Sequence, residues 1–245
     1  MKFCIINFKT KNTWLIFAAV SLIIITATVL GIVLESFVTG SGALNTLVEP
    51  TKTVIIDPGH GGEDCGAIGC TGVLEKALNI DFSKTIGELL LTEGVNVVYT
   101  RTEDVMLYKP EENIKGMRKL SDLKSRVEIS DKLPGAIFIS IHMNSFGDEK
   151  YSGLQVYAKD KDESSATLAE SIRKEVVSGC EPDNKREVKK GDKIYVLEKN
   201  TNTSVLIECG FLSNREECER LSQKEFQKEL SFSIVCGIIK YMKEN

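Results

Sequence analysis

The chain has 245 residues, a formal net charge of −4 and 27 % charged residues. This length accommodates one domain of ordinary size and a shorter additional segment. Because no basic stripe runs along the sequence, its charge argues against a nucleic-acid partner. Length and charge together therefore predict a single domain with an appendage.

The first element predicted along the chain is an apolar segment over residues 14–34, interrupted only by small or hydroxyl residues. About 20 such residues are enough to span a bilayer. Basic residues precede the segment and acidic residues follow it, namely Lys2, Lys9 and Lys11 before it and Glu35 and Glu49 after it. This bias places residues 1–13 in the cytoplasm and the rest of the chain on the outer side of the membrane.

A cleaved signal peptide is the alternative for this segment. Its apolar core would be shorter, and no suitable small-residue cleavage site follows directly. We therefore favour a transmembrane anchor or uncleaved signal, and the chain is exported on either interpretation. Residues 35–52, which include Gly40-Ser41-Gly42, are expected to form a linker, and residues 53–245 the globular domain.

Strand and helix patterns alternate along this domain. Short β-branched runs predict strands at residues 54–57, 95–100, 136–142, 154–157, 195–197 and 205–208. Apolar residues with helical spacing form three stripes, from Leu74 to Leu90, Leu168 to Val176 and Phe226 to Ile238. The alternation predicts an α/β domain with a mainly parallel central sheet flanked by helices.

The two histidines of the chain, His60 and His142, each follow or close an apolar strand pattern. Open α/β sheets place their ligand sites at strand ends, so this shared setting predicts a two-histidine metal site. Zinc in hydrolases takes a third protein ligand and keeps one position open. Glu75, in the first turn of a predicted helix, is the best candidate. On spacing alone, a surface carboxylate that complements the helix dipole is the stronger interpretation.

Glu208 is the second informative carboxylate, because it ends the apolar run from Ser204 and precedes a glycine turn. Burying a carboxylate there is costly unless it is paired or near a metal. A loop-side hydrogen-bonding role is the ordinary alternative. Beside a two-histidine site, the position of Glu208 favours a role as general base. A metal-bound water needs such a base to become the attacking nucleophile.

The chain has seven cysteines, an odd number that leaves at least one thiol unpaired. Cys4 falls on the cytoplasmic side, and Cys209 and Cys236 lie in apolar patterns that predict burial. Cys65 and Cys70 flank a glycine-rich loop near His60. A disulfide between these two is an open alternative, whereas their spacing does not fit a second metal site.

Six segments of the domain, in this order, carry a resemblance: Ile56–Gly62, Leu74–Lys76, Thr100–Arg101, Leu123–Val127, Ser140–Asn144 and Leu206–Asn214. With them the chain resembles the zinc-dependent N-acetylmuramoyl-L-alanine amidases of the Amidase_3 family over about residues 53–245. The resemblance implies Zn²⁺ held by His60, Glu75 and His142, with Glu208 as the catalytic glutamate. It favours Glu75 as a ligand over the surface alternative. Asn144 is a candidate for substrate contact.

Within this family the chain resembles the sporulation-type, CwlD-like amidases, which have one hydrophobic N-terminal segment, one catalytic domain and no wall-binding repeats. The resemblance implies hydrolysis of the bond between N-acetylmuramic acid and L-alanine in peptidoglycan, a role in the spore cortex, and a forespore-envelope location. Family members are often switched on by partner proteins, so an activator protein is a candidate partner. Two alternatives remain: another zinc hydrolase of the wall (a carboxypeptidase or deacetylase), and a membrane-tethered binding module without catalysis.

Overall fold

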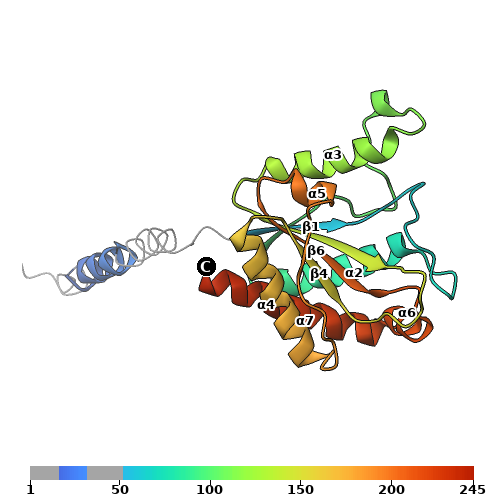
Figure 1. Cartoon of the computed structure of the whole chain (residues 1–245). Helices are drawn as coiled ribbons and strands as arrows, with labels where there is room; N and C mark the ends of the chain where they lie inside the picture. The colour runs from blue at the N-terminus through green and yellow to red at the C-terminus, as the bar shows by residue number, and fades with distance from the viewer. Residues whose placement is uncertain (1–16, 32–51) are drawn as a thin grey trace, which may run out of the picture. The chain divides into compact units, whose positions relative to one another are not determined.

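The computed structural model describes residues 17–31 and 52–245, and the chain divides into one unit up to Pro50 and a second from Thr51 to the C-terminus (Figure 1). Residues 17–31 form an exposed helix. Within the two described ranges, no helix combines the length and the apolar character needed to cross a membrane. The ends of the predicted apolar segment, the N-terminal residues 1–13 and nearly all of the predicted linker lie outside the described residues.

The second unit is built on a six-stranded sheet with the order β2-β1-β3-β6-β4-β5. Its strands are β1 (Thr53–Pro58), β2 (Asn96–Tyr99), β3 (Ile137–Asn144), β4 (Gln155–Ala158), β5 (Lys189–Lys190) and β6 (Thr203–Phe211). The four neighbouring strands β2, β1, β3 and β6 run parallel to one another, whereas β4 pairs antiparallel with β6. The predicted mainly parallel α/β sheet is therefore confirmed.

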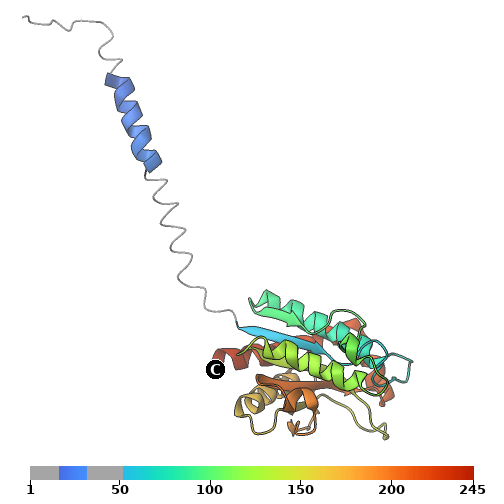
Figure 2. The ribbon, with the colours of Figure 1, turned by 90° about the horizontal axis from the view of Figure 1, so that it is seen from above.

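Helices cover both faces of the sheet (Figures 1 and 2). They are α2 (Glu75–Thr92), α3 (Arg118–Asp131), α4 (Glu163–Gly179), α5 (Tyr195–Glu198), α6 (Arg215–Leu221) and α7 (Lys224–Glu244), with a 3-10 turn, η1, at Pro110–Glu112. The larger core joins one sheet face to α2, α4 and α7. A smaller core joins the opposite face to α3 and α5.

Successive residues of the central strands pack alternately into the two cores. In β1, Val54 and Ile56 pack in the larger core and Ile55 in the smaller one. In β3, Ile139 belongs to the larger core and Phe138 to the smaller. Because both faces are covered, the strands are apolar without interruption, as expected for a parallel sheet.

One predicted strand is wrong, and two helices, α3 and α6, were not predicted. The run Tyr195–Leu197 was expected as a strand, but it opens the short helix α5, with Val196 and Leu197 buried. Short buried apolar runs have the same residue pattern in strands and in helices, so periodicity cannot distinguish the two. The helices α3 and α6 carry no apolar stripe that would have predicted them, because buried polar residues such as Ser121, Asp122 and Arg126 occupy much of the inner side of α3.

Candidate active site

The strand order brings together three of the predicted site residues, His60, His142 and Glu208. β1, β3 and β6 are neighbours in the sheet, and their carboxyl ends share one edge. His60 lies two residues beyond β1, His142 lies near the end of β3, and Glu208 lies in the second half of β6. Glu75 reaches the same edge as the first residue of α2.

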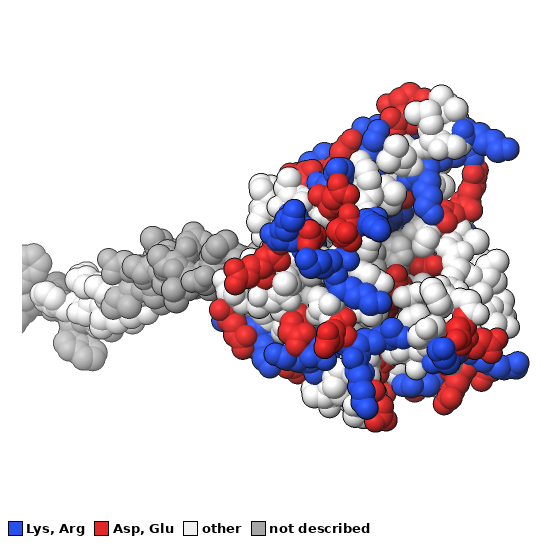
Figure 3. Space-filling model, in the orientation of Figure 1, with Lys and Arg blue, Asp and Glu red and all other residues white. Residues whose placement is uncertain are grey.

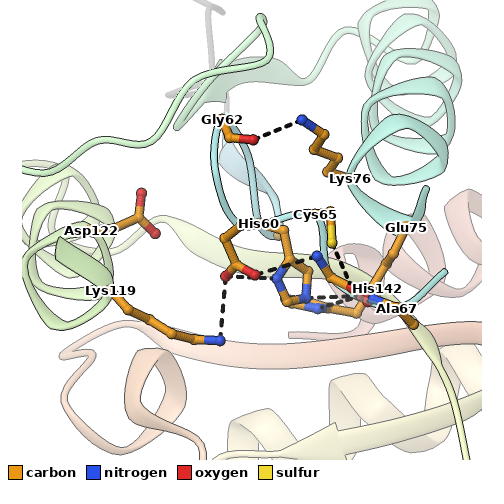
Figure 4. Close-up of polar contacts among 12 residues, drawn as sticks. His60, Gly62, Cys65, Ala67, Glu75, Lys76, Lys119, Asp122 and His142 are labelled. Atoms are coloured by element: carbon orange, nitrogen blue, oxygen red, sulfur yellow. Dashed lines mark hydrogen bonds and ion pairs between the residues drawn. The ribbon is translucent and has the colours of Figure 1, made fainter. Parts of the chain in front are cut away.

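His60, Glu75 and His142 point toward one another (Figure 4). Glu75 Oε1 lies 3.1 Å from His60 Nε2 and 3.0 Å from His142 Nδ1. The centroids of the two imidazole rings are 4.9 Å apart. Four-coordinate zinc with donors at about 2.0–2.1 Å holds neighbouring donors about 3.3 Å apart. The three side chains therefore have the chemistry and nearly the spacing of a zinc ligand set.

The charges of the cluster favour a cation between the rings. Burial alone would lower the pKa of His60, but the carboxylates of Asp64 and Glu75 outweigh burial and raise it to about 9. Burial alone would raise the pKa of Glu75, and the two imidazoles instead hold it well below its usual range. Protons and a metal ion thus compete for the same nitrogen atoms, as is usual for such ligands.

Asp64 orients His60 from the other side of its ring. Its Oδ2 lies 2.9 Å from His60 Nδ1, which leaves Nε2 directed at Glu75. Lys119 Nζ lies 3.3 Å from the same carboxylate oxygen. Metal-binding histidines commonly have a carboxylate on the second ring nitrogen. The role of Asp64 was not predicted from the sequence, although this carboxylate follows His60 by only four residues.

Two glycines let the backbone approach the ligands closely. A Cβ atom at Gly59 would lie 2.1 Å from Nε2 of the His142 ring, and one at Gly66 would lie 2.4 Å from Oε2 of Glu75. Gly66 also has a φ of +67°. The next residue, Ala67, donates its N–H to Glu75 Oε2 at 2.7 Å. The glycine-rich loop is therefore folded directly onto the ligand carboxylate.

His60 adopts a φ of 60°, in the left-handed region that residues other than glycine rarely occupy. Two buried arginines hold the backbone here. Arg126 donates to the carbonyls of Pro58 (2.8 Å) and His60 (2.7 Å). Arg101 donates to the carbonyls of Pro58 (2.8 Å) and Gly59 (2.7 Å). These bonds over-determine the strained conformation, as backbone outliers at functional sites require.

Arg126 is held in turn by buried carboxylates. It donates to Asp57 Oδ1 at 2.7 Å from Nη1, and to Asp122 Oδ2 at 2.7 Å from Nε. Thr100 and Ser140 donate to the two oxygens of Asp57 at 2.6 and 2.7 Å. The segments containing Thr100 and Arg126 contributed to the resemblance without an assigned role. The structure gives them one, which is to support the backbone that carries His60.

Glu208 lies beside the cluster but is not part of it. It is the register partner of His142, and its Oε2 is buried without a hydrogen-bond partner in the described part of the chain. Burial raises the pKa of Glu208 to about 7, with the negative charge of Glu75 adding to the effect and His142 opposing it. A carboxylate with a pKa near neutrality and a free oxygen suits proton transfer.

Asn144 is the last residue of β3 and is half-buried. Its main-chain carbonyl accepts a hydrogen bond from Leu212 N at 2.8 Å, and its strand partner is Phe211. It therefore lies at the same sheet edge as His142, two residues further along the strand. Its contact with substrate stays a prediction.

The six cysteines within the described residues are all free thiols. The alternative of a bond between Cys65 and Cys70 is therefore not realised here. Cys65 is half-buried and donates to the carbonyl of Gly66 at 3.2 Å, whereas Cys70 is exposed. Cys209 is buried as predicted, but Cys236 is only half-buried.

Comparison with known proteins gives consistent matches to one group. Residues 54–240 match the family model Amidase_3, described as N-acetylmuramoyl-L-alanine amidase. A germination-specific N-acetylmuramoyl-L-alanine amidase of Bacillus subtilis is 34 % identical over 195 residues, which are 79 % of this chain and 81 % of that protein.

Solved structures agree with this result. The CwlD amidase of Clostridioides difficile, determined in complex with the GerS lipoprotein, superposes with a TM-score of 0.76 at 38 % identity, over 80 % of this chain and all of that one. The amidase AmiC2 of Nostoc punctiforme has a TM-score of 0.67 at 34 % identity, over 78 % of this chain and 97 % of the other. The chain therefore belongs to the Amidase_3 family, the N-acetylmuramoyl-L-alanine amidases.

Proposed function

We propose that this amidase is a zinc enzyme in which His60, Glu75 and His142 bind the metal and Glu208 is the general base. As a member of its family, the protein hydrolyses the amide bond between N-acetylmuramic acid and L-alanine in peptidoglycan. The observation that carries the zinc proposal is the convergence of one carboxylate oxygen and two imidazole nitrogens at 3.0–3.1 Å.

Zinc at such a site supplies a Lewis acid for the amide carbonyl and lowers the pKa of water. The chain's own residues provide the rest. Glu208 takes the proton of the attacking water at its free Oε2 and then delivers it to the nitrogen of the leaving L-alanine. Asp64 keeps the His60 ring oriented, and Arg126 fixes the backbone at His60.

The site also suits neutral pH. A general base is most effective when its pKa is close to the working pH, and burial brings the pKa of Glu208 to about 7 before any cation is bound beside it. Its raised pKa arises from being enclosed beside Glu75 rather than from a hydrogen bond that would occupy Oε2. The oxygen thus stays free for water.

The biological setting is proposed from the relatives. A germination-specific amidase and a CwlD amidase are both similar to the chain over about four fifths of its length, which supports a role in the spore cortex. We propose that the catalytic domain acts outside the cytoplasm, in the forespore envelope, with the apolar segment 14–34 as its anchor. Because the CwlD structure contains GerS, we also propose a protein activator for this chain.

The central experiment is mass spectrometry of peptidoglycan fragments after incubation with the purified domain and zinc. An amidase releases peptides with a free L-alanine amino group and leaves intact N-acetylmuramic acid. Loss of a C-terminal D-alanine would identify a carboxypeptidase, and loss of acetyl groups a deacetylase. Parallel digestion of spore-cortex and vegetative-wall peptidoglycan tests the proposed cortex role, and metal analysis of the purified protein identifies the ion.

A further inference from the structure

The glycine-rich loop that joins His60 to Glu75 lies against α6, a helix far along the chain. Cys70 Sγ is 3.8 Å from the main-chain oxygen of Arg215, and Thr71 Oγ1 is 4.0 Å from Sγ of Cys218. A Cβ atom at Gly69 would lie 2.7 Å from the same sulfur. Three consecutive loop residues therefore lie against the start of α6 and the thiol of Cys218.

The two thiols are neighbours with different exposure. Cys218 is fully buried beneath the loop, whereas Cys70 is exposed. The proximity of the Cys218 thiol is the largest influence on the Cys70 thiol and raises its pKa. Gly69 and Thr71, the residues on either side of Cys70, both approach Sγ of Cys218, so the two thiols are neighbours. An exposed thiol above a buried one is the arrangement in which the first can react with a reagent and the second can resolve the product.

The contact joins the loop of the active site to a helix from a distant segment. On one side is the loop, whose Ala67 N–H binds the carboxylate of Glu75. On the other side is α6, which begins after the strand that carries Glu208. Inside the loop, Gly69 N–H donates to the carbonyl of Val73 at 2.8 Å, so Cys70 sits in a tight turn.

We propose that Cys70 and Cys218 are a disulfide-forming pair, and that the bond fastens the metal-ligand loop to α6. The reaction needs an oxidant, which we assign to the class of accessible disulfides, small or protein-borne. The thiolate of Cys70 attacks one sulfur of that disulfide and releases one thiol. The thiolate of Cys218 then attacks Sγ of Cys70 and releases the second thiol. Two protein thiols are oxidised, and one external disulfide is reduced to two thiols.

Formation of the bond can be tested independently of the zinc assignment, because the bond can be detected without metal or activity. The reduced full-length protein is incubated with oxidised glutathione at about pH 8.5, alkylated, and mapped by peptide mass spectrometry. We expect a linked pair of peptides containing Cys70 and Cys218. The melting temperature of the oxidised protein should exceed that of the reduced protein by about 5 °C or more, because the bond closes a loop of well over 100 residues.

Variants make the test specific. Cys70→Ser changes an exposed residue and should abolish both the linked peptides and the shift in melting temperature. Cys65→Ser, in the same loop, is the matched control and should keep both. Release of zinc to a chelator should be several-fold slower in the oxidised protein than in the reduced one, and the difference should vanish in Cys70→Ser.

Three results would overturn the proposal. One is a stable glutathione adduct on Cys70 with no linked peptides. Another is a bond between Cys65 and Cys70. The third is a bond between Cys70 and Cys218 that leaves the melting temperature and the rate of zinc release unchanged, since the bond would then not stabilise the loop.

Discussion

His142 and Glu208 are register partners on the adjacent parallel strands β3 and β6. Partners in such a pair project to the same face of the sheet. The relative position of the proposed ligand and the proposed base is therefore set by backbone hydrogen bonds of the sheet, and no side-chain bond to Glu208 is needed. This leaves Glu208 Oε2 buried but unpaired, ready to accept a proton.

The first prediction concerns the metal ligands. Replacing His60, Glu75 or His142 by alanine should abolish activity and reduce bound zinc, because two remaining ligands cannot hold the ion against water. Zinc content by mass spectrometry and peptidoglycan hydrolysis measure the two effects. A Glu75→Ala protein that kept both zinc and activity would remove Glu75 from the ligand set.

The second prediction separates metal binding from proton transfer. Glu208→Gln keeps the size of the side chain but cannot accept the proton, so turnover should fall at least ~100-fold, the usual scale for a positioned base. Zinc content should match that of the parent protein. Loss of zinc in this variant would instead identify Glu208 as a ligand.

The third prediction tests the close approach at Gly59. Gly59→Ala should displace the His142 ring, since the new methyl would lie 2.1 Å from Nε2. We expect weaker zinc binding and a large loss of activity. Gly147→Ala is the matched control, because a Cβ at Gly147 meets no described atom within 4 Å. Equal zinc affinities in the two variants would contradict this account of the site.

The fourth prediction concerns the support beneath the site. Arg126→Met leaves the buried carboxylate of Asp57 without its cation, which should cost about 3–5 kcal/mol of unfolding free energy. Arg173→Met removes a more exposed pair with Glu170 and should cost less than about 1 kcal/mol. Urea titrations give both values. Zinc affinity should fall only in Arg126→Met, because Arg126 also holds the carbonyl of His60.

The fifth prediction is a pH dependence of stability. Burial raises the pKa of Glu217 from its ordinary 4.5 to about 7, although the N–H groups of Gly153 and Phe211 donate to its carboxylate. Between these two values the folded chain keeps a proton that the unfolded chain has lost. The stabilisation is complete below 4.5 and disappears as the pH rises through 7.

The unfolding free energy should consequently drop by about 1–3 kcal/mol between pH 5 and 8 on account of this residue. Urea titrations at several pH values measure the drop. Glu217→Gln does not titrate, so its stability should vary less over this range. Curves that run parallel for the parent and the variant would show that Glu217 does not carry the effect.

Much of the site could be predicted because its residues lie where strand patterns end. His60, His142 and Glu208 all follow or close apolar runs, and the carboxyl ends of neighbouring parallel strands meet at one edge. Glu75 was harder, because an acidic residue in the first turn of a helix is common. Only the resemblance to a family raised it above a surface role.

The supporting network could not be predicted in the same way. Arg126 and Asp57 are fully buried charged residues, and a charged residue in a sequence is ordinarily expected at the surface. Their pairing joins residues 69 positions apart, which no local pattern encodes. The helix α3 was missed for the same reason, since much of its buried side is polar. The contact between the loop and α6 likewise arises from long-range packing.

Because the chain contains only two histidines, their NMR signals report on the site directly. His60 and His142 are the only imidazoles in the sequence, and their ring centroids are 4.9 Å apart. In a protein labelled only on histidine, every imidazole resonance would therefore come from this site. A through-space magnetisation transfer between the two rings would depend directly on the distance between them. The separation of the two proposed ligand rings could thus be followed by NMR in the unaltered chain, without an attached label or an engineered substitution.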